Sequence, residues 1–154
     1  MWATGGRCRT RFRRSVHRSE GSFLGFHVHW ENRGVVKRYF GQVSAEELIA
    51  PVIATEADPR FDRLRYVIND FLDATSVTFT QADIDEIAAY DIGAALTNPR
   101  IKVAVVVVQE DVIELVGRYI QASGMAYPTR VFPTMAQARA WVAEPSPGWP
   151  VTQL

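Results

Sequence analysis

The sequence predicts an α/β domain built on a mixed sheet of about five strands, and three observations support this fold class. Strand and helix patterns alternate along most of the 154-residue chain, which is typical of parallel strands joined by right-handed crossovers. The first two strand patterns are joined by a short turn instead, so the sheet should begin as an antiparallel hairpin. Residues 101–108 are almost entirely apolar, as expected of a strand that is covered on both faces.

The opening hairpin is predicted over residues 23–42. Apolar and polar side chains alternate over residues 23–30, with two histidines on one side of the strand. Residues 31–34 indicate a turn in which Gly34 can adopt a positive φ. Residues 35–42 then form the return strand.

The first helix is predicted to begin at Ser44, which has capping-box spacing to Glu47. Pro51 lies within the apolar stripe of this helix and should kink or weaken it. Residues 54–62 are expected to form a loop. Residues 66–72 are rich in aromatic and β-branched side chains, so they predict the next strand.

Two further helices are predicted on either side of the apolar strand. The first runs from Thr80, which has an acidic capping-box partner in Asp83, to residue 97. The second is amphipathic and covers residues 111–123. Gly124 follows it and is placed to end it, because glycine readily adopts the left-handed conformation found after helices.

The last elements are a short strand at residues 129–132 and a helix that begins at Thr134. Gln137 has capping-box spacing to this threonine, and the helix should end near residue 143. Three prolines follow, so residues 144–154 are expected to form a tail.

The formal net charge of zero hides two oppositely charged parts of the chain. Residues 1–20 contain six arginines and one acid, a charge of +5, whereas residues 21–154 contain 11 basic and 16 acidic residues, a charge of −5. Residues 1–22 lack apolar periodicity, so we expect a disordered, arginine-rich extension before a domain at 23–143. The extension is open to three interpretations: a dispensable segment, a transit-like segment, or a basic arm for nucleic acid or anionic lipid.

The composition of the domain indicates an ordinary globular protein. Over the whole chain, 47% of residues are hydrophobic and 22% are charged. The negative charge of the domain disfavours nucleic-acid binding. No apolar segment has the length of a bilayer span and no secretory pattern follows the arginines, so a cytoplasmic protein is expected. The hairpin leaves a sheet edge to cover, which makes a homodimer an open alternative.

Polar side chains follow three of the predicted strands, at the positions where ligands bind in open α/β sheets. These positions are Asn69, Asp70 and Asp73, residues 109–111, and residues 133–134. We take Asp70, Asp73 and Glu110 as candidate ligand-binding residues, whose carboxylates could also hold a hard cation such as magnesium. The structural alternative is stronger, because acids are stabilised at a helix start and in turns, so no metal is predicted.

Asp91 is the fourth candidate ligand-binding residue, because it falls on the apolar face of its predicted helix. At about 100° per residue, it lies only about 20° around the helix from Ile84. An acid at this position is buried or lines a cavity, and it needs a partner. It is either a pocket carboxylate with a shifted pKa, the partner of Arg100 or another arginine in an ion pair, or a residue at the edge of the helix.

Motifs of the common enzyme classes are missing from the sequence. It contains no G-x-S-x-G, no G-x-x-x-x-G-K and no G-x-G-x-x-G. The single cysteine, Cys8, lies in the extension, and His27 and His29 have no third metal-ligating partner in the domain. There are only two lysines, Lys37 and Lys102, so Schiff-base chemistry is not expected. No cofactor is predicted.

Four segments of the chain resemble the SpoIIAA-like proteins, a family related to STAS domains. The segments are RYFGQVSAEEL, DPRFDRLRYVINDFLD, DIGAALTNPRIKVAVVV and YPTRVFPTMAQARAWV, and the resemblance covers roughly residues 24–143. It implies a small sheet of mostly four or five strands with helices, in single-domain proteins of largely uncharacterised role. The family's similarity to lipid-carrier folds implies that an apolar ligand is conceivable.

STAS-type anti-sigma-factor antagonists carry a phosphorylatable serine in an Asp-Ser-Ser/Thr-Gly turn that opens a helix. The corresponding segment here, residues 73–80, lacks the glycine and the adjacent serine pair, and is expected to be a longer loop. Thr75, Ser76 and Thr78 offer hydroxyl groups, but none matches the motif. No phosphorylation site is therefore predicted from the resemblance.

Three functions are consistent with these observations. We favour a non-enzymatic regulatory or ligand-binding module that takes an apolar, lipid-like ligand or a protein partner. The first alternative is a protein switch like the anti-sigma-factor antagonists, acting on a kinase-like regulator. The second alternative is a small hydrolase or transferase that uses Asp70 or Asp91.

Overall fold

The computed structural model describes residues 25–145. The predicted extension at 1–22 and most of the predicted tail lie outside the described residues. The strands are β1 (Phe26–Trp30), β2 (Gly34–Ser44), β3 (Tyr66–Thr78), β4 (Lys102–Val106) and β5 (Thr129–Phe132). The helices are α1 (Ala45–Glu56), the 3-10 helix η1 (Phe61–Arg63), α2 (Gln81–Thr97), α3 (Glu110–Ala122) and α4 (Met135–Ala143).

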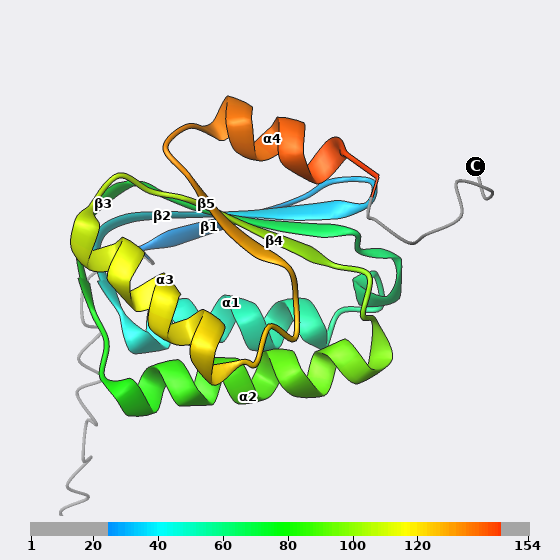
Figure 1. Cartoon of the computed structure of the whole chain (residues 1–154), viewed down its shortest axis with the longest axis horizontal. Helices are drawn as coiled ribbons and strands as arrows, with labels where there is room; N and C mark the ends of the chain where they lie inside the picture. Colours follow the sequence, from blue (N-terminus) through cyan, green and yellow to red (C-terminus); the bar gives the residue numbers. More distant parts are fainter. Residues whose placement is uncertain (1–24, 146–154) are drawn as a thin grey trace, which may run out of the picture.

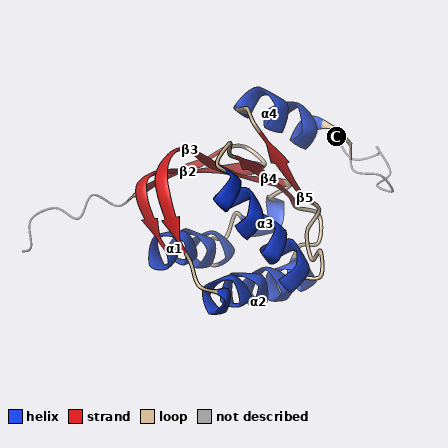
Figure 2. Ribbon diagram, turned by 60° about the vertical axis from the view of Figure 1, so that its left-hand side comes forward, coloured by secondary structure: helices blue, strands red, loops and turns tan. Residues whose placement is uncertain are grey.

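The five strands form one mixed sheet in the order β1-β2-β3-β4-β5. β1 pairs with β2 in antiparallel orientation, and the remaining neighbours are parallel. Helices α1, α2 and α3 cover one face of the sheet, and α4 covers the other (Figure 1, Figure 2). The predicted fold class is confirmed, including the opening hairpin and the alternation that follows it.

Alternate residues of the strands point to opposite faces and supply two separate cores. The core under α1, α2 and α3 contains Val35, Tyr39, Val67, Phe71, Val103 and Val105. The core under α4 contains Ile68, Ala104, Val106, Ala138 and Trp141. All five residues of β4 are buried, which confirms that the apolar segment is an interior strand covered on both faces.

The helices begin where the capping residues predict. Ser44 caps α1 through a reciprocal capping box with Glu47. Thr80 caps α2, and Thr134 caps α4 by accepting the backbone N–H of Gln137. Within residues 25–145, every helix is too short or too polar to span a bilayer.

Helix α1 is longer than the sequence indicates. It continues through Pro51 as far as Glu56, so the prediction of a loop from residue 54 is wrong at its first residues. Pro51 is buried, and its carbonyl accepts a 2.6 Å hydrogen bond from the Thr55 hydroxyl one turn later. This extra turn places Glu56 on the side of α1 that faces the sheet.

Strand β3 is also longer than predicted, because residues 73–78 continue it instead of forming a loop. Their backbone pairs with the end of β2, from Phe40 to Ser44, after two shifts of register. Gly41 has a positive φ of 68° next to the second shift, as is common where one strand carries an extra residue. Residues 73–78 are too polar to be recognised as a strand from the sequence, because their hydrogen-bonding partner is the distant end of β2.

Gly34 is required in the hairpin for a reason other than the predicted one. The positive-φ residues among 25–145 are Gly41, Gly124 and Met125, so Gly34 does not adopt the expected conformation. A Cβ atom at Gly34 would instead lie 2.0 Å from Cζ of Tyr66. The absence of a side chain therefore allows the tyrosine ring to pass over the start of β2. Gly124 does have the positive φ expected after a helix.

Candidate functional site

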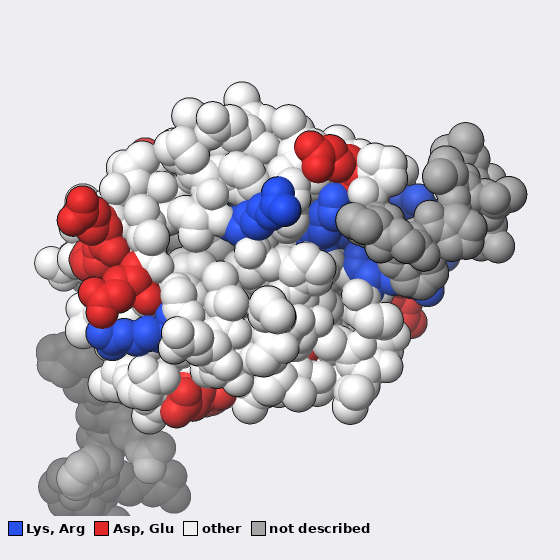
Figure 3. All heavy atoms as spheres, viewed as in Figure 1, with Lys and Arg blue, Asp and Glu red and all other residues white. Residues whose placement is uncertain are grey.

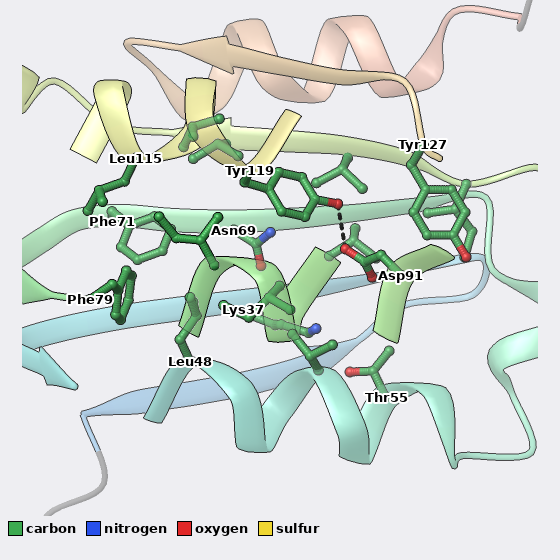
Figure 4. A pocket seen from close by; sticks show the side chains of 18 of the residues that line it. Lys37, Leu48, Thr55, Asn69, Phe71, Phe79, Asp91, Leu115, Tyr119 and Tyr127 are labelled. Atoms are coloured by element: carbon green, nitrogen blue, oxygen red, sulfur yellow. Dashed lines mark hydrogen bonds between the residues drawn. The ribbon is translucent and has the colours of Figure 1, made fainter. Parts of the chain in front are cut away.

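A cavity of about 100 Å³ lies between the sheet and helices α1, α2 and α3. Its wall is mainly aliphatic and aromatic, with contributions from strands β2, β3 and β4. Five polar residues that the site depends on also line it: Lys37, Glu56, Asp91, Tyr119 and Tyr127. Figure 4 shows that the labelled polar side chains Lys37, Asp91, Tyr119 and Tyr127 reach toward one end of the cavity, while Leu48, Phe71, Phe79 and Leu115 lie toward the other.

Asp91 is part of the cavity wall, as one of the sequence interpretations predicts. It comes from α2, and its Oδ2 atom accepts a 2.5 Å hydrogen bond from the hydroxyl of Tyr119 on α3 (Figure 4). Burial raises the pKa of Asp91, and the tyrosine hydrogen bond and the nearby Lys37 cation oppose that rise. These partners of Asp91 line the cavity with it, and its ligand-binding role stays a prediction.

Glu56 of α1 is the second carboxylic acid at this end of the cavity. It interacts with Asp91 directly, and burial together with the charge of Asp91 raises the pKa of Glu56 to about 7. Two carboxylates in contact repel each other when both are ionised, so such a pair retains one proton near neutral pH. We therefore expect the pair to carry one negative charge in total.

Lys37 provides the positive charge of the site. It points inward from β2, between the buried residues Val35 and Tyr39, and is 3% exposed. Burial lowers the pKa of Lys37 to about 8, against the attraction of Asp91 and Glu56, which raises it. Within residues 25–145, these long-range attractions rather than a hydrogen bond compensate its charge.

Two oxygen atoms at the polar end are buried without a hydrogen-bond partner among the described residues: the Tyr127 hydroxyl and Oε1 of Glu56. Burial of such atoms costs free energy that a hydrogen bond normally offsets. Glu56 lies against the carboxyl group of Asp91, which can donate a hydrogen bond to it only when Asp91 itself is protonated. The polar end of the cavity therefore offers unused hydrogen-bonding capacity.

Two other candidate residues, Asp70 and Asp73, lie on the opposite side of the sheet. Asp70 is 2% exposed and belongs to the face that α4 covers, as does its neighbour Ile68. Nε of Arg38 lies 3.3 Å from Oδ2 of Asp70 and 3.4 Å from Oδ2 of Asp73. Both aspartates therefore balance one arginine, and neither reaches the cavity. Asn69 directly precedes Asp70 in β3 and therefore points to the other face of the sheet, where it lines the cavity.

The candidate residues after β4 have structural contacts. Gln109 donates a hydrogen bond of 2.9 Å to the carbonyl of Ala74 and so connects the end of β4 to the extended part of β3. Glu110 and Asp111 are exposed in the first turn of α3, where the helix dipole favours acids. Figure 3 shows acidic side chains gathered on this face where α3 begins. Glu110 does not line the cavity, and its ligand-binding role stays a prediction.

Residues 25–145 contain no group of three or more histidine, cysteine or acidic side chains arranged to hold a metal ion. His27 and His29 are exposed on the edge strand β1. The candidate carboxylates are separated by the sheet, with Asp91 of α2 on one side and Asp70 of β3 on the other.

Two residues of the site, Lys37 and Glu56, are absent from the sequence-based candidates. The apolar periodicity of the sequence nevertheless places both at inward-facing positions. Lys37 occupies the inward position of a strand whose neighbours at i−2 and i+2 are Val35 and Tyr39. Glu56 comes four residues after Val52, and therefore on the same apolar stripe of α1. Each is a charged residue at a buried position, the same signal that identifies Asp91.

Comparison with known proteins gives a likeness in structure alone. No family model and no curated protein matches the sequence. The structure of the anti-sigma factor antagonist SpoIIAA in its unphosphorylated form superposes with a TM-score of 0.52, at 10% identity, over 76% of this chain and 96% of that one. The chain has a SpoIIAA-like fold.

Two further structures of SpoIIAA-like proteins superpose less well. An anti-sigma factor antagonist from Mycobacterium paratuberculosis gives a TM-score of 0.48 at 15% identity, covering 77% of this chain and 93% of its own. An uncharacterised protein with a SpoIIAA-like fold from Shewanella loihica gives 0.42 at 13% identity, covering 76% and 91%. The superposition on SpoIIAA confirms the resemblance seen in the sequence at the level of the fold.

Proposed function

We propose that this domain binds a small, uncharged molecule with an apolar body and one hydroxyl or carbonyl group in the cavity between the sheet and helices α1, α2 and α3. The observation that carries the proposal is the pair of buried, unpartnered oxygens, of Tyr127 and Glu56, at one end of an otherwise apolar cavity. A well-formed apolar cavity with a few convergent polar groups is the usual form of a small-molecule site.

The charges around the cavity favour a neutral ligand. One lysine cation, Lys37, faces a carboxyl pair that carries about one negative charge, so the site is close to neutral without a ligand. An added charge would be buried without a counter-ion, which costs several kcal/mol. A hydroxyl or carbonyl group can instead use the free hydrogen-bonding capacity of the polar end.

The volume limits the ligand to a small one. A cavity of about 100 Å³ is on the scale that accommodates one small ring or a short chain. A long acyl chain does not fit without rearrangement of the helices. The proposal is therefore narrower than a lipid carrier, although it keeps the apolar ligand that the family resemblance implies.

The test compares benzyl alcohol with toluene, which have the same ring and differ in one hydroxyl group. Amide chemical shifts of the full-length protein are followed by NMR for the wild type, for Tyr127→Phe at the polar end, and for Asp73→Asn on the opposite side of the sheet. We expect saturable shifts around the cavity, with Tyr127→Phe weakening benzyl alcohol roughly three- to tenfold but not toluene. Asp73→Asn should bind both as the wild type does.

Two results would refute this binding function. One is the absence of saturable shifts with either compound in the wild type. The other is a set of shifts confined to exposed positions such as Leu96 and Met125, which would indicate surface adsorption instead of cavity binding.

A second candidate function is a protein switch of the anti-sigma-factor antagonist type, and the SpoIIAA-like fold favours it. The hydroxyl residues considered for phosphorylation, Thr75, Ser76 and Thr78, are located in the extended part of β3 and not in a turn before a helix. Affinity capture with the wild type, compared with Ser76→Asp, tests this candidate. A specific partner that the aspartate variant releases supports it, and the absence of any specific partner excludes it.

A further inference from the structure

The amine of Lys37 is set in the cavity in a way that suits covalent chemistry. Its side chain extends from β2 across an apolar wall, and its Nζ lies near the polar end where Asp91 is located (Figure 4). Lysines are usually exposed, and a fully buried one has a functional explanation more often than an exposed one. Among the described residues, the charges of Asp91 and Glu56 attract the Lys37 amine, and no hydrogen bond holds it in place.

The other lysine of the chain shows what a structural buried lysine looks like. Lys102 on β4 donates hydrogen bonds of 3.0 Å to the carbonyl of Trp141 and 2.6 Å to the carbonyl of Glu144. These two bonds fix its protons on the last turn of α4. The Lys102 amine is therefore committed to the fold, whereas the Lys37 amine faces a cavity.

We propose that Lys37 forms a Schiff base with a small aldehyde or ketone bound in the cavity, contrary to the expectation from the low number of lysines. This inference rests on the proposed binding function and narrows its ligand to the carbonyl class. The apolar wall would hold the body of the ligand, and the carbonyl group would lie at the polar end, beside the amine.

The chemistry balances with the groups that are present. The lone pair of the neutral Lys37 amine attacks the carbonyl carbon, so the carbon–nitrogen bond forms as the carbonyl π bond breaks. The oxygen takes one proton from the carboxyl pair and the nitrogen returns one to it, which gives a neutral carbinolamine. The hydroxyl group is then protonated and leaves as water when the carbon–oxygen bond breaks, the nitrogen lone pair forms the carbon–nitrogen double bond, and the resulting iminium keeps its proton or returns it to the carboxyl pair as it becomes the imine. The net reaction joins amine and carbonyl with release of one water, and needs no oxidant or reductant.

The carboxyl pair supplies the proton transfers of these steps. Glu56 from α1 and Asp91 from α2 share about one proton near neutral pH, so one of them can donate while the other accepts. Tyr119 from α3 fixes the orientation of Asp91 through its hydrogen bond. Tyr127 faces the same end of the cavity, and burial keeps its hydroxyl protonated by raising its pKa.

The electrostatics support the reactive form of the amine. Burial lowers the pKa of Lys37 to about 8, so a useful fraction of the amine is neutral near physiological pH. The mainly apolar wall of the cavity also disfavours hydrolysis of the imine. Both effects support the inference, which rests on the position of the Lys37 amine in the cavity.

The experiment traps the imine with benzaldehyde and sodium cyanoborohydride, which reduces it to a stable secondary amine. The full-length protein offers three primary amines: Lys37, Lys102 and the chain's own α-amino group. Intact mass and peptide mapping should show roughly tenfold or more adduct on Lys37 than on Lys102. The control variant Lys102→Arg should leave the Lys37 adduct unchanged, and Lys37→Met should remove it while circular dichroism shows an intact fold.

Benzyl alcohol separates the failure of this inference from the failure of the binding function. If it binds in the cavity but benzaldehyde labels Lys37 no more than Lys102, the Schiff base is refuted and the binding function stands. If neither compound enters the cavity, both are refuted. Adduct at the α-amino group alone also overturns the inference.

Discussion

The hydroxyl of Tyr119 on α3 donates a 2.5 Å hydrogen bond to the carboxylate of Asp91 on α2, inside the cavity. This bond connects two neighbouring helices at the point where both face the sheet. It also explains why α2 carries an acid on its apolar face, since a buried carboxylate needs a donor. The properties of the site follow from this pair and from the two charged neighbours, Lys37 and Glu56.

Removal of the Tyr119 hydroxyl should destabilise the domain and raise the pKa of Asp91 further. Tyr119→Phe leaves the buried carboxyl without its donor, which we expect to cost about 1–3 kcal/mol in the free energy of unfolding. Urea denaturation measures the change. Tyr90→Phe, at a 36% exposed position of α2, is the matched control and should change stability little. Equal effects of the two substitutions would contradict the role assigned to the bond.

The lowered pKa of Lys37 should make the protein more stable as the pH rises above 8. The group titrates at about 8 when folded and at 10.5 when unfolded, so the unfolded chain binds more protons in between and the free energy of unfolding increases with pH. The full gain is on the order of 3 kcal/mol. It is followed by urea denaturation between pH 8 and 9, below the pKa of 10.0 at which unfolded tyrosines ionise. Lys37→Met should abolish this rise, and a rise that persists in the variant would refute the assignment.

The raised pKa of Glu56 should have the opposite effect and make the protein less stable as the pH rises. Its pKa is 4.5 in the unfolded chain and about 7 in the fold, so the folded state binds more protons and stability should fall as the pH increases from 4.5 to 7. Glu56 is partly exposed to solvent, which reduces the loss to no more than about 2 kcal/mol. Glu56→Gln should flatten this part of the stability profile. Glu46→Gln, at an exposed position of α1, should retain the fall, and equal profiles for the two variants would contradict the prediction.

Two glycines should respond to alanine in opposite directions. Gly34→Ala places a Cβ atom 2.0 Å from Cζ of Tyr66, so we expect a loss of about 1–3 kcal/mol. Gly93 lies inside α2 with no atom within 4 Å of the added Cβ, and Gly93→Ala should stabilise the helix by up to about 1 kcal/mol. Thermal unfolding distinguishes the two. Restoration of the Gly34→Ala loss by Tyr66→Ala would confirm the steric cause, and a harmless Gly34→Ala would exclude it.

The sequence predicts the order of the elements well because their signals are local. Apolar periodicity and the capping residues Ser44, Thr80 and Thr134 identify where most strands and helices lie. The extension of β3 to Thr78 could not be predicted this way, because residues 73–78 are polar and their partner is the distant end of β2. Local patterns do not contain such a pairing.

The candidate site was predicted only in part, for a related reason. Asp91 stands out because an acid on an apolar helix face is unusual. The same signal marks Lys37 at an inward position of β2. The loop expected from residue 54 hides Glu56, whose helical position four residues after Val52 depends on the extra turn of α1. Asp70 and Asp73 follow a strand as ligand-binding acids often do, but their side chains lie on the face that α4 covers.

The most direct test of the account is an NMR titration of the full-length protein with benzyl alcohol, in the wild type and in Val105→Phe. Val105 lines the cavity from β4, and the larger ring should occupy the space that a ligand needs. Ile113→Phe, at a 40% exposed position of α3, is the control for an added ring outside the cavity. We expect saturable shifts around the cavity in the wild type and in Ile113→Phe, and none in a folded Val105→Phe. Identical shifts in all three proteins, or none in the wild type, would contradict a ligand-binding cavity.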